Sequence, residues 1–216
     1  DYGHIVSGNE GQSIWMNYPG FTAFYFNARY QGPVANWDFT NFNNPLWIPP
    51  LMDIPGAALD VMIAGGNING SGSHMVRLSF NGGGITAAEM PFDFENASGG
   101  SFVSAMAYSP TVTTNWYALT GNGKFFRSSD SGNSWTVTSA FDGPTNHYFY
   151  GSDILVLSTG EIFISGSGYT NPGVAKSTNG GQSFTPIQGT LPQTMVFALA
   201  AHQDETVIFA ATEVGP

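Results

Sequence analysis

The stretch that decides the fold is Ser128-Ser129-Asp130-Ser131-Gly132-Asn133-Ser134-Trp135, which recurs as Ser177-Thr178-Asn179-Gly180-Gly181-Gln182-Ser183-Phe184. Ser177 follows Ser128 by 49 residues. A weaker copy begins another 49 residues earlier, at Ser79, with Thr86 in the place of the aromatic residue. Of a fourth copy only Trp37 remains. A repeat of this length indicates an architecture built from similar units.

Five apolar runs accompany the repeat, and each is bounded by small or turn-forming residues. They lie at 14–20, 61–66, 116–121, 162–166 and 208–212. Short runs of this kind are typical of buried strands. In the two best copies we expect strands at 102–109, 113–120, 123–129 and 134–139, and at 152–158, 161–167, 173–177 and 183–188. Four antiparallel strands in a period of about 45–50 residues are typical of a propeller blade.

We therefore predict an all-β chain, a β-propeller of four-stranded antiparallel blades. The expected blades are 1–41, 42–91, 101–140 and 151–189, followed by a partial blade at 194–216. The last repeat stops after its second strand. This pattern favours an incomplete part of a propeller of six to eight blades, and a closed four-bladed ring is the alternative.

The repeated motif resembles the Asp box, or BNR repeat, of sialidases, sortilin-type receptors and xyloglucanase-like hydrolases. The resemblance implies a structural role at the blade periphery for Ser128, Asp130, Gly132, Trp135, Ser177, Asn179, Gly181 and Phe184. Independently of the resemblance, the Asp130 carboxylate can accept hydrogen bonds from its own turn, where Gly132 supplies a positive φ.

Composition and one further resemblance indicate the partners and the location. Five Lys and Arg face fifteen Asp and Glu, a net charge of −10, which argues against nucleic acid. Cysteine is absent, and the histidines at 4, 74, 147 and 202 lack metal-ligand spacing, so neither metal nor cofactor is expected. No apolar run approaches the roughly 18 residues of a membrane span. The repeats, especially Phe197-Ala198-Leu199-Ala200 leading into Ile208-Phe209-Ala210-Ala211-Thr212-Glu213, resemble those of large secreted Bacteroidota proteins. This resemblance implies an extracellular or bacterial cell-surface location and components of type IX secretion as partners.

The candidate ligand-binding residues stand in loops expected on the face opposite the repeated turns. They are Trp47, Asp53, Asp93, Glu95, Asp142, His147, Tyr150 and Tyr169. Aromatic rings beside carboxylates suit a sugar or a peptide. Packing between blades for Tyr150, and a solvated loop for Asp93 and Glu95, are the competing interpretations.

The predicted function is a secreted or cell-surface propeller that binds or scaffolds a glycan or a protein. The alternative is a glycoside hydrolase of the xyloglucanase or sialidase type, with catalytic residues partly outside this chain. A hydrolase needs two carboxylates facing each other at about 5–10 Å, and spacing along the chain identifies no such pair. Arg29, Arg77 and Arg127 match a sialidase arginine triad in type, but they precede the repeat and are expected at the outer end of third strands.

Overall fold

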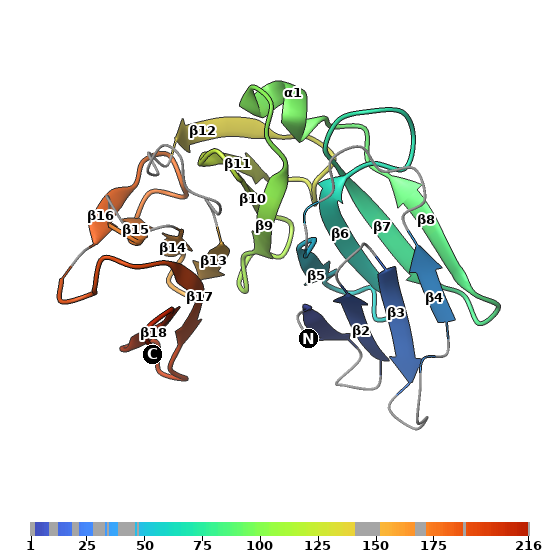
Figure 1. The fold of residues 1–216 in the computed structure, drawn as a ribbon, viewed down its shortest axis with the longest axis horizontal. Helices are drawn as coiled ribbons and strands as arrows, with labels where there is room; N and C mark the ends of the chain where they lie inside the picture. The colour runs from blue at the N-terminus through green and yellow to red at the C-terminus, as the bar shows by residue number, and fades with distance from the viewer. Residues whose placement is uncertain are drawn as a thin grey trace. The chain divides into compact units, whose positions relative to one another are not determined.

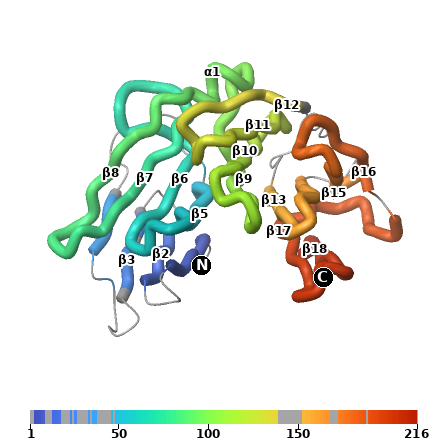
Figure 2. The backbone as a smooth tube through the Cα atoms, turned by 180° about the vertical axis from the view of Figure 1, so that it is seen from behind, coloured from blue at the N-terminus to red at the C-terminus, as the bar shows by residue number. Residues whose placement is uncertain are grey.

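The computed structural model describes residues 3–8, 13–18, 22–27, 33, 35–38, 46, 48–140, 152–166, 172–187 and 189–215. The chain divides into two compact units, Asp1–Val103 and Ser104–Pro216. Figure 1 shows their strands, and Figure 2 traces the same backbone from behind.

The first unit holds two four-stranded antiparallel sheets whose strands follow chain order. The strands of the first sheet are β1 (Ile5–Gly8), β2 (Ser13–Tyr18), β3 (Thr22–Asn27) and β4 (Ala35–Asp38). Those of the second are β5 (Leu51–Asp53), β6 (Asp60–Gly66), β7 (His74–Phe80) and β8 (Ile85–Glu89). A five-residue helix, α1 (Phe94–Ser98), follows β8 and was not predicted.

The second unit repeats this arrangement (Figure 1). One four-stranded sheet contains β9 (Val103–Tyr108), whose first residue belongs to the first unit, β10 (Trp116–Thr120), β11 (Lys124–Ser128) and β12 (Thr136–Ala140). The next contains β13 (Asp153–Val156), β14 (Ile162–Ser165), β15 (Val174–Ser177) and β16 (Thr185–Ile187). A two-stranded sheet of β17 (Val196–Ala201) and β18 (Ile208–Thr212) follows.

The five apolar runs all fall on second strands: β2, β6, β10, β14 and β18. Every residue of β10 and of β14 is buried. A strand covered on both faces needs no alternation of apolar and polar residues, which explains the continuous runs. The prediction of an all-β propeller fold with four-stranded antiparallel blades is confirmed.

Apolar side chains of neighbouring sheets form the core inside each unit. In the first unit Trp15 and Tyr25 pack with Leu51, Ile63 and Val76. In the second unit the core between the two four-stranded sheets contains Tyr117, Leu119, Phe125, Ile162 and Ile164. Among the described residues, no helix has the length and apolar character needed to cross a membrane.

Candidate functional site

The turn between β11 and β12 is closed by Asp130. The Ser128 hydroxyl donates to Asp130 Oδ1 over 2.7 Å and accepts the N–H of Gly132 over 2.9 Å. The carboxylate also accepts the Ser134 N–H over 2.9 Å and the Ser134 hydroxyl over 2.6 Å. These hydrogen bonds, above all that of the Ser134 hydroxyl, lower the pKa of Asp130 to about 2. The side chain is therefore ionised at neutral pH.

The turn between β15 and β16 makes the same connections with an amide. Ser177 Oγ donates to Asn179 Oδ1 over 2.8 Å and accepts the Gly181 N–H over 2.9 Å. The Ser183 N–H donates to Asn179 Oδ1 over 3.0 Å, and Asn179 Nδ2 donates to Ser183 Oγ over 2.8 Å. Only the direction of this last bond differs from the first turn, so the geometry of the turn does not require a charge.

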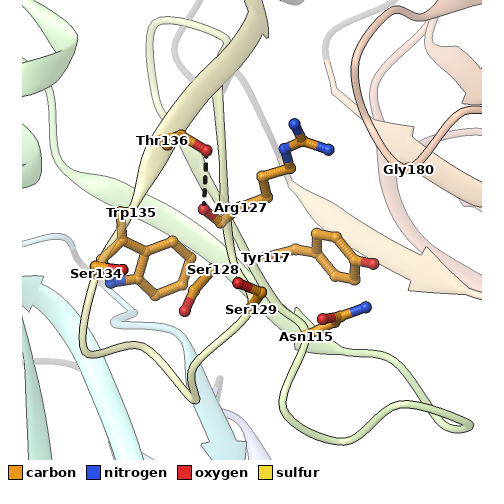
Figure 3. A pocket seen from close by; sticks show the side chains of 9 residues that line it. All are labelled: Asn115, Tyr117, Arg127, Ser128, Ser129, Ser134, Trp135, Thr136 and Gly180. Carbon is orange, nitrogen blue, oxygen red and sulfur yellow. Dashed lines mark hydrogen bonds between the residues drawn. The ribbon is translucent and has the colours of Figure 1, made fainter.

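A pocket of about 490 Å³ lies beside the first turn (Figure 3). The residues that line it are Asn115, Tyr117, Arg127, Ser128, Ser129, Ser134, Trp135, Thr136 and Gly180. Tyr117 on β10 and Arg127 on β11 are cross-strand partners in the register of the two strands. Figure 3 shows the side chains of Asn115, Tyr117 and Arg127 extending toward the loop that carries Gly180.

The pocket combines one positive charge with polar groups. Arg127 is half-buried, and no carboxylate forms an ion pair with it in the part of the chain that the structure describes. Burial raises the pKa of Tyr117, an effect partly offset by the charge of Arg127. The phenol is therefore protonated at neutral pH and can donate or accept a hydrogen bond. The walls include the buried rings of Trp135 and Tyr117, which are 8% and 7% exposed.

Of the sequence-predicted ligand residues, Asp93 holds a loop and a helix together. Its Oδ1 accepts the N–H groups of Ser73, Glu95 and Asn96 over 3.1, 3.0 and 3.2 Å. The last two bonds cap the N-terminus of α1. Glu95 lies in the first turn of that helix.

Asp53 is the last residue of β5 and is partly buried. The other predicted ligand residues, Trp47, Asp142, His147, Tyr150 and Tyr169, lie outside the described residues, as does Arg29. Arg77 forms an ion pair with Asp60.

Several other described carboxylates also bind backbone N–H groups. Glu89 Oε2 accepts the N–H groups of Ile68 and Asn69, and Glu205 accepts both the N–H and the hydroxyl of Ser158. Asp153 accepts the N–H of Leu199 over 2.8 Å, and burial raises its pKa. These carboxylates thus hold backbone segments in place. Among the described residues, no group of three or more His, Asp or Glu side chains is placed to hold a metal ion.

Sequence reasoning did not identify the pocket, although it singled out Ser128 and Trp135 as structural residues and Arg127 as an outer-strand residue. The sequence of the β10–β11 hairpin could have predicted one part of the pocket, the pairing of Tyr117 with Arg127. The Gly121-Asn122-Gly123 turn sets the strand register, and this register places Arg127 opposite Tyr117.

No model of a known protein family matches the chain, and no curated protein matches its sequence. The chain is similar in structure to the GH74 enzyme of Niastella koreensis, with a TM-score of 0.69 and 18% identity over 98% of this chain and 33% of that chain. It is also similar to the GH74 xyloglucanase of Xanthomonas campestris, with a TM-score of 0.62 and 18% identity over 89% of this chain and 31% of that chain.

A different kind of propeller matches about as well. The Cps50 (Swd1) β-propeller domain of Myceliophteria thermophila gives a TM-score of 0.66 and 9% identity over 97% of this chain and 65% of that chain. The chain therefore spans about a third of the GH74 chains and about two thirds of this domain. Identities this low show a shared propeller fold, and the fold by itself does not select a function.

Proposed function

We propose that this chain belongs to a glycan-binding propeller and that the pocket of Figure 3 holds part of the sugar. The observation that carries the proposal is the composition of this pocket. Its volume falls within the range of about 300–1,000 Å³ that is usual for ligand sites. Hydroxyl, amide, phenol and guanidinium groups line it, and such groups complement the many donors and acceptors of a sugar.

Two further features belong to the same proposal. The serine–aspartate and serine–asparagine turns act as Asp boxes that stabilise the blade, and the protein works outside the cell or on the bacterial cell surface. Type IX secretion components as partners, and a second contact face formed by the predicted loop residues around Trp47 and Tyr169, remain predictions. The low share of Lys and Arg and the absence of cysteine support the extracellular or cell-surface location.

A glycoside hydrolase is the alternative, and the structural similarity to two GH74 enzymes supports it. Of the described acids, Asp93, Asp130, Asp153 and Glu205 all accept hydrogen bonds from backbone N–H groups. A carboxylate that holds a loop in this way is poorly suited to donate a proton to a leaving group. Catalysis would therefore depend on other acids, such as Asp142, or on residues outside this chain.

The test is calorimetric titration of the protein with neutral gluco-oligosaccharides and with uronic-acid oligosaccharides. Arg127→Gln is compared with Lys124→Gln, which removes the same charge from the same strand outside the pocket. Binding that Arg127→Gln weakens and Lys124→Gln leaves unchanged is the expected result. Release of reducing ends during the titration would favour the hydrolase, and binding that neither variant changes would place the sugar elsewhere.

A further inference from the structure

We propose that the sugar bound in this pocket carries a carboxylate, that Arg127 binds this carboxylate, and that Tyr117 and Asn115 bind the adjacent hydroxyls of the sugar. The inference rests on the proposed function and names the class of glycan that the site selects. The charge of the chain is the first observation that supports it. The chain has fifteen acidic residues and five basic ones, so carboxylates that could pair with an arginine are abundant.

Two of the other three Lys and Arg residues that the structure describes are paired in this way, and Lys124 forms no ion pair with a described residue. Arg77 is bound to Asp60, and Lys176 is bound to Glu161 over 2.5 Å. Arg127 has no such partner in the described ranges, yet it is half-buried in the wall of a pocket. Partial burial of a guanidinium without a directly bound carboxylate costs solvation energy. An anion supplied by a ligand would offset this cost.

The neighbouring side chains are placed to bind the same ligand as Arg127. Asn115 and Tyr117 are two residues apart, so their side chains lie on one face of the β10 strand and its extension. The register places Arg127 opposite Tyr117, and Figure 3 shows all three side chains extending to the same side. No hydrogen bond joins the Tyr117 hydroxyl, the Asn115 amide or the Arg127 guanidinium to another described side chain.

A single carboxylate fits this set better than a more highly charged group. Its two oxygens match the two parallel N–H groups of a guanidinium, which leaves the phenol and the amide for the adjacent sugar hydroxyls. The ionised Asp130 lies in the turn that borders the pocket, and the whole chain carries a charge of −10. Both repel a polyanion more strongly than a monoanion.

The decisive experiment compares a glucuronic-acid oligosaccharide with its carboxyl-reduced form, which differs only at that group. We expect the acidic form to bind about tenfold or more tightly, because a charge-assisted bidentate pair is gained. Arg127→Gln should abolish the difference and leave weak binding of the reduced form, whereas Lys124→Gln should preserve the difference. Arg127→Lys should restore only part of it, because the ammonium lacks the planar fork.

A second pair of variants tests the site without removing the arginine. Gly180 has a φ of 68°, and a β-carbon built there would lie 3.9 Å from Arg127 Nη1. Asn and Asp both tolerate this backbone region better than other side chains. Gly180→Asp should therefore place a competing carboxylate beside Arg127 and lower affinity for the acidic sugar, and Gly180→Asn should lower it much less.

Each remaining outcome has a definite meaning. Equal binding of the acidic and reduced sugars would overturn this inference and leave the proposed glycan site standing. Binding of neither sugar would overturn both. A sulfated analogue that binds more tightly than the carboxylate, or a glutamate-rich peptide that displaces the sugar in an Arg127-dependent manner, would overturn the assignment of the ligand as an acidic glycan with one carboxylate.

Discussion

Gly181 leaves the space that the Phe125 ring occupies. A β-carbon at Gly181 would lie 2.3 Å from Phe125 Cε1, far inside van der Waals contact. Phe125 is on β11 and is fully buried, and Gly181 is in the turn that follows β15. Thr138 on β12 donates a hydrogen bond to the Gly181 carbonyl over 2.5 Å. The repeated turn of one blade thus packs against the preceding blade inside the second unit.

Gly181→Ala should destabilise the second unit by roughly 2–4 kcal/mol, because a positive φ and a core overlap are combined. Gly180→Ala is the matched control. It has a similar φ of 68° but no neighbour closer than 3.9 Å, so it should cost only about 1–2 kcal/mol. Urea unfolding of the two variants measures the difference, and equal midpoints would contradict the packing role.

Asp130→Asn should remove part of the sensitivity of the protein to acid. The pKa of Asp130 is lowered from 3.8 to about 2 in the folded state. Its contribution to stability is therefore complete above about pH 4 and is lost as the pH falls through 2. Asn179 makes the equivalent bonds without a charge, so the variant should fold normally at pH 7.

Thermal unfolding of the parent and of Asp130→Asn between pH 2 and pH 6 checks this prediction. The difference in stability should change only in the window from about pH 4 to pH 2, in favour of the variant at the acid end. A constant difference across the range would mean that the hydrogen bonds to Asp130 do not depend on its ionisation.

Asp93→Ala should lower the stability of the first unit by about 0.5–2 kcal/mol, the usual cost of losing a helix cap. The carboxylate also accepts the Ser73 N–H, which holds the loop before β7. Glu95→Ala removes a neighbouring carboxylate without a hydrogen bond to a described residue and should cost less than about 0.5 kcal/mol. Chemical denaturation compares the two, and a larger cost for Glu95 would contradict the capping role.

Trp135→Ala should destabilise by about 3–5 kcal/mol, as expected for a large side chain removed from the core. The indole is 8% exposed, and its N–H donates to the Gly132 carbonyl over 2.9 Å. Trp135→Phe should be tolerated much better, because Phe184 takes the equivalent place in the next turn and packs on Phe125 at 4.9 Å between ring centroids. A calorimetric melt in which both variants behave alike would argue against this equivalence.

The blade fold could be predicted from the sequence because its signals are local. The Ser128 and Ser177 turns are built from residues within a few positions of each other, and apolar runs such as Ile162–Ser165 mark the second strands directly. Helix α1 was missed because five residues are too few for a helical period, although Asp93 and Gly99 are suitable caps at its two ends.

The pocket could not be predicted because it depends on contacts distant in sequence. Gly180 reaches the pocket from the turn of another sheet, and no sequence pattern shows that the two turns meet. In the same way, the role of Asp93 depends on Ser73, twenty residues earlier in the chain. Spacing along the chain shows which residue types are present in a loop, but the partners of a carboxylate are fixed only by the packing of loops.

The most direct test of the glycan pocket is the response of the tryptophan indole N–H signals in a ¹⁵N NMR spectrum. The chain has five tryptophans, and Trp135→Phe identifies the Trp135 signal by its loss. Trp135 lines the pocket, whereas Trp116 is not among the lining residues and its indole N–H donates to the Thr113 carbonyl. On addition of the glucuronic-acid oligosaccharide, the account predicts a saturable shift of the Trp135 signal with little change at Trp116. Shifts confined to other indoles, with Trp135 unmoved at saturation, would contradict it.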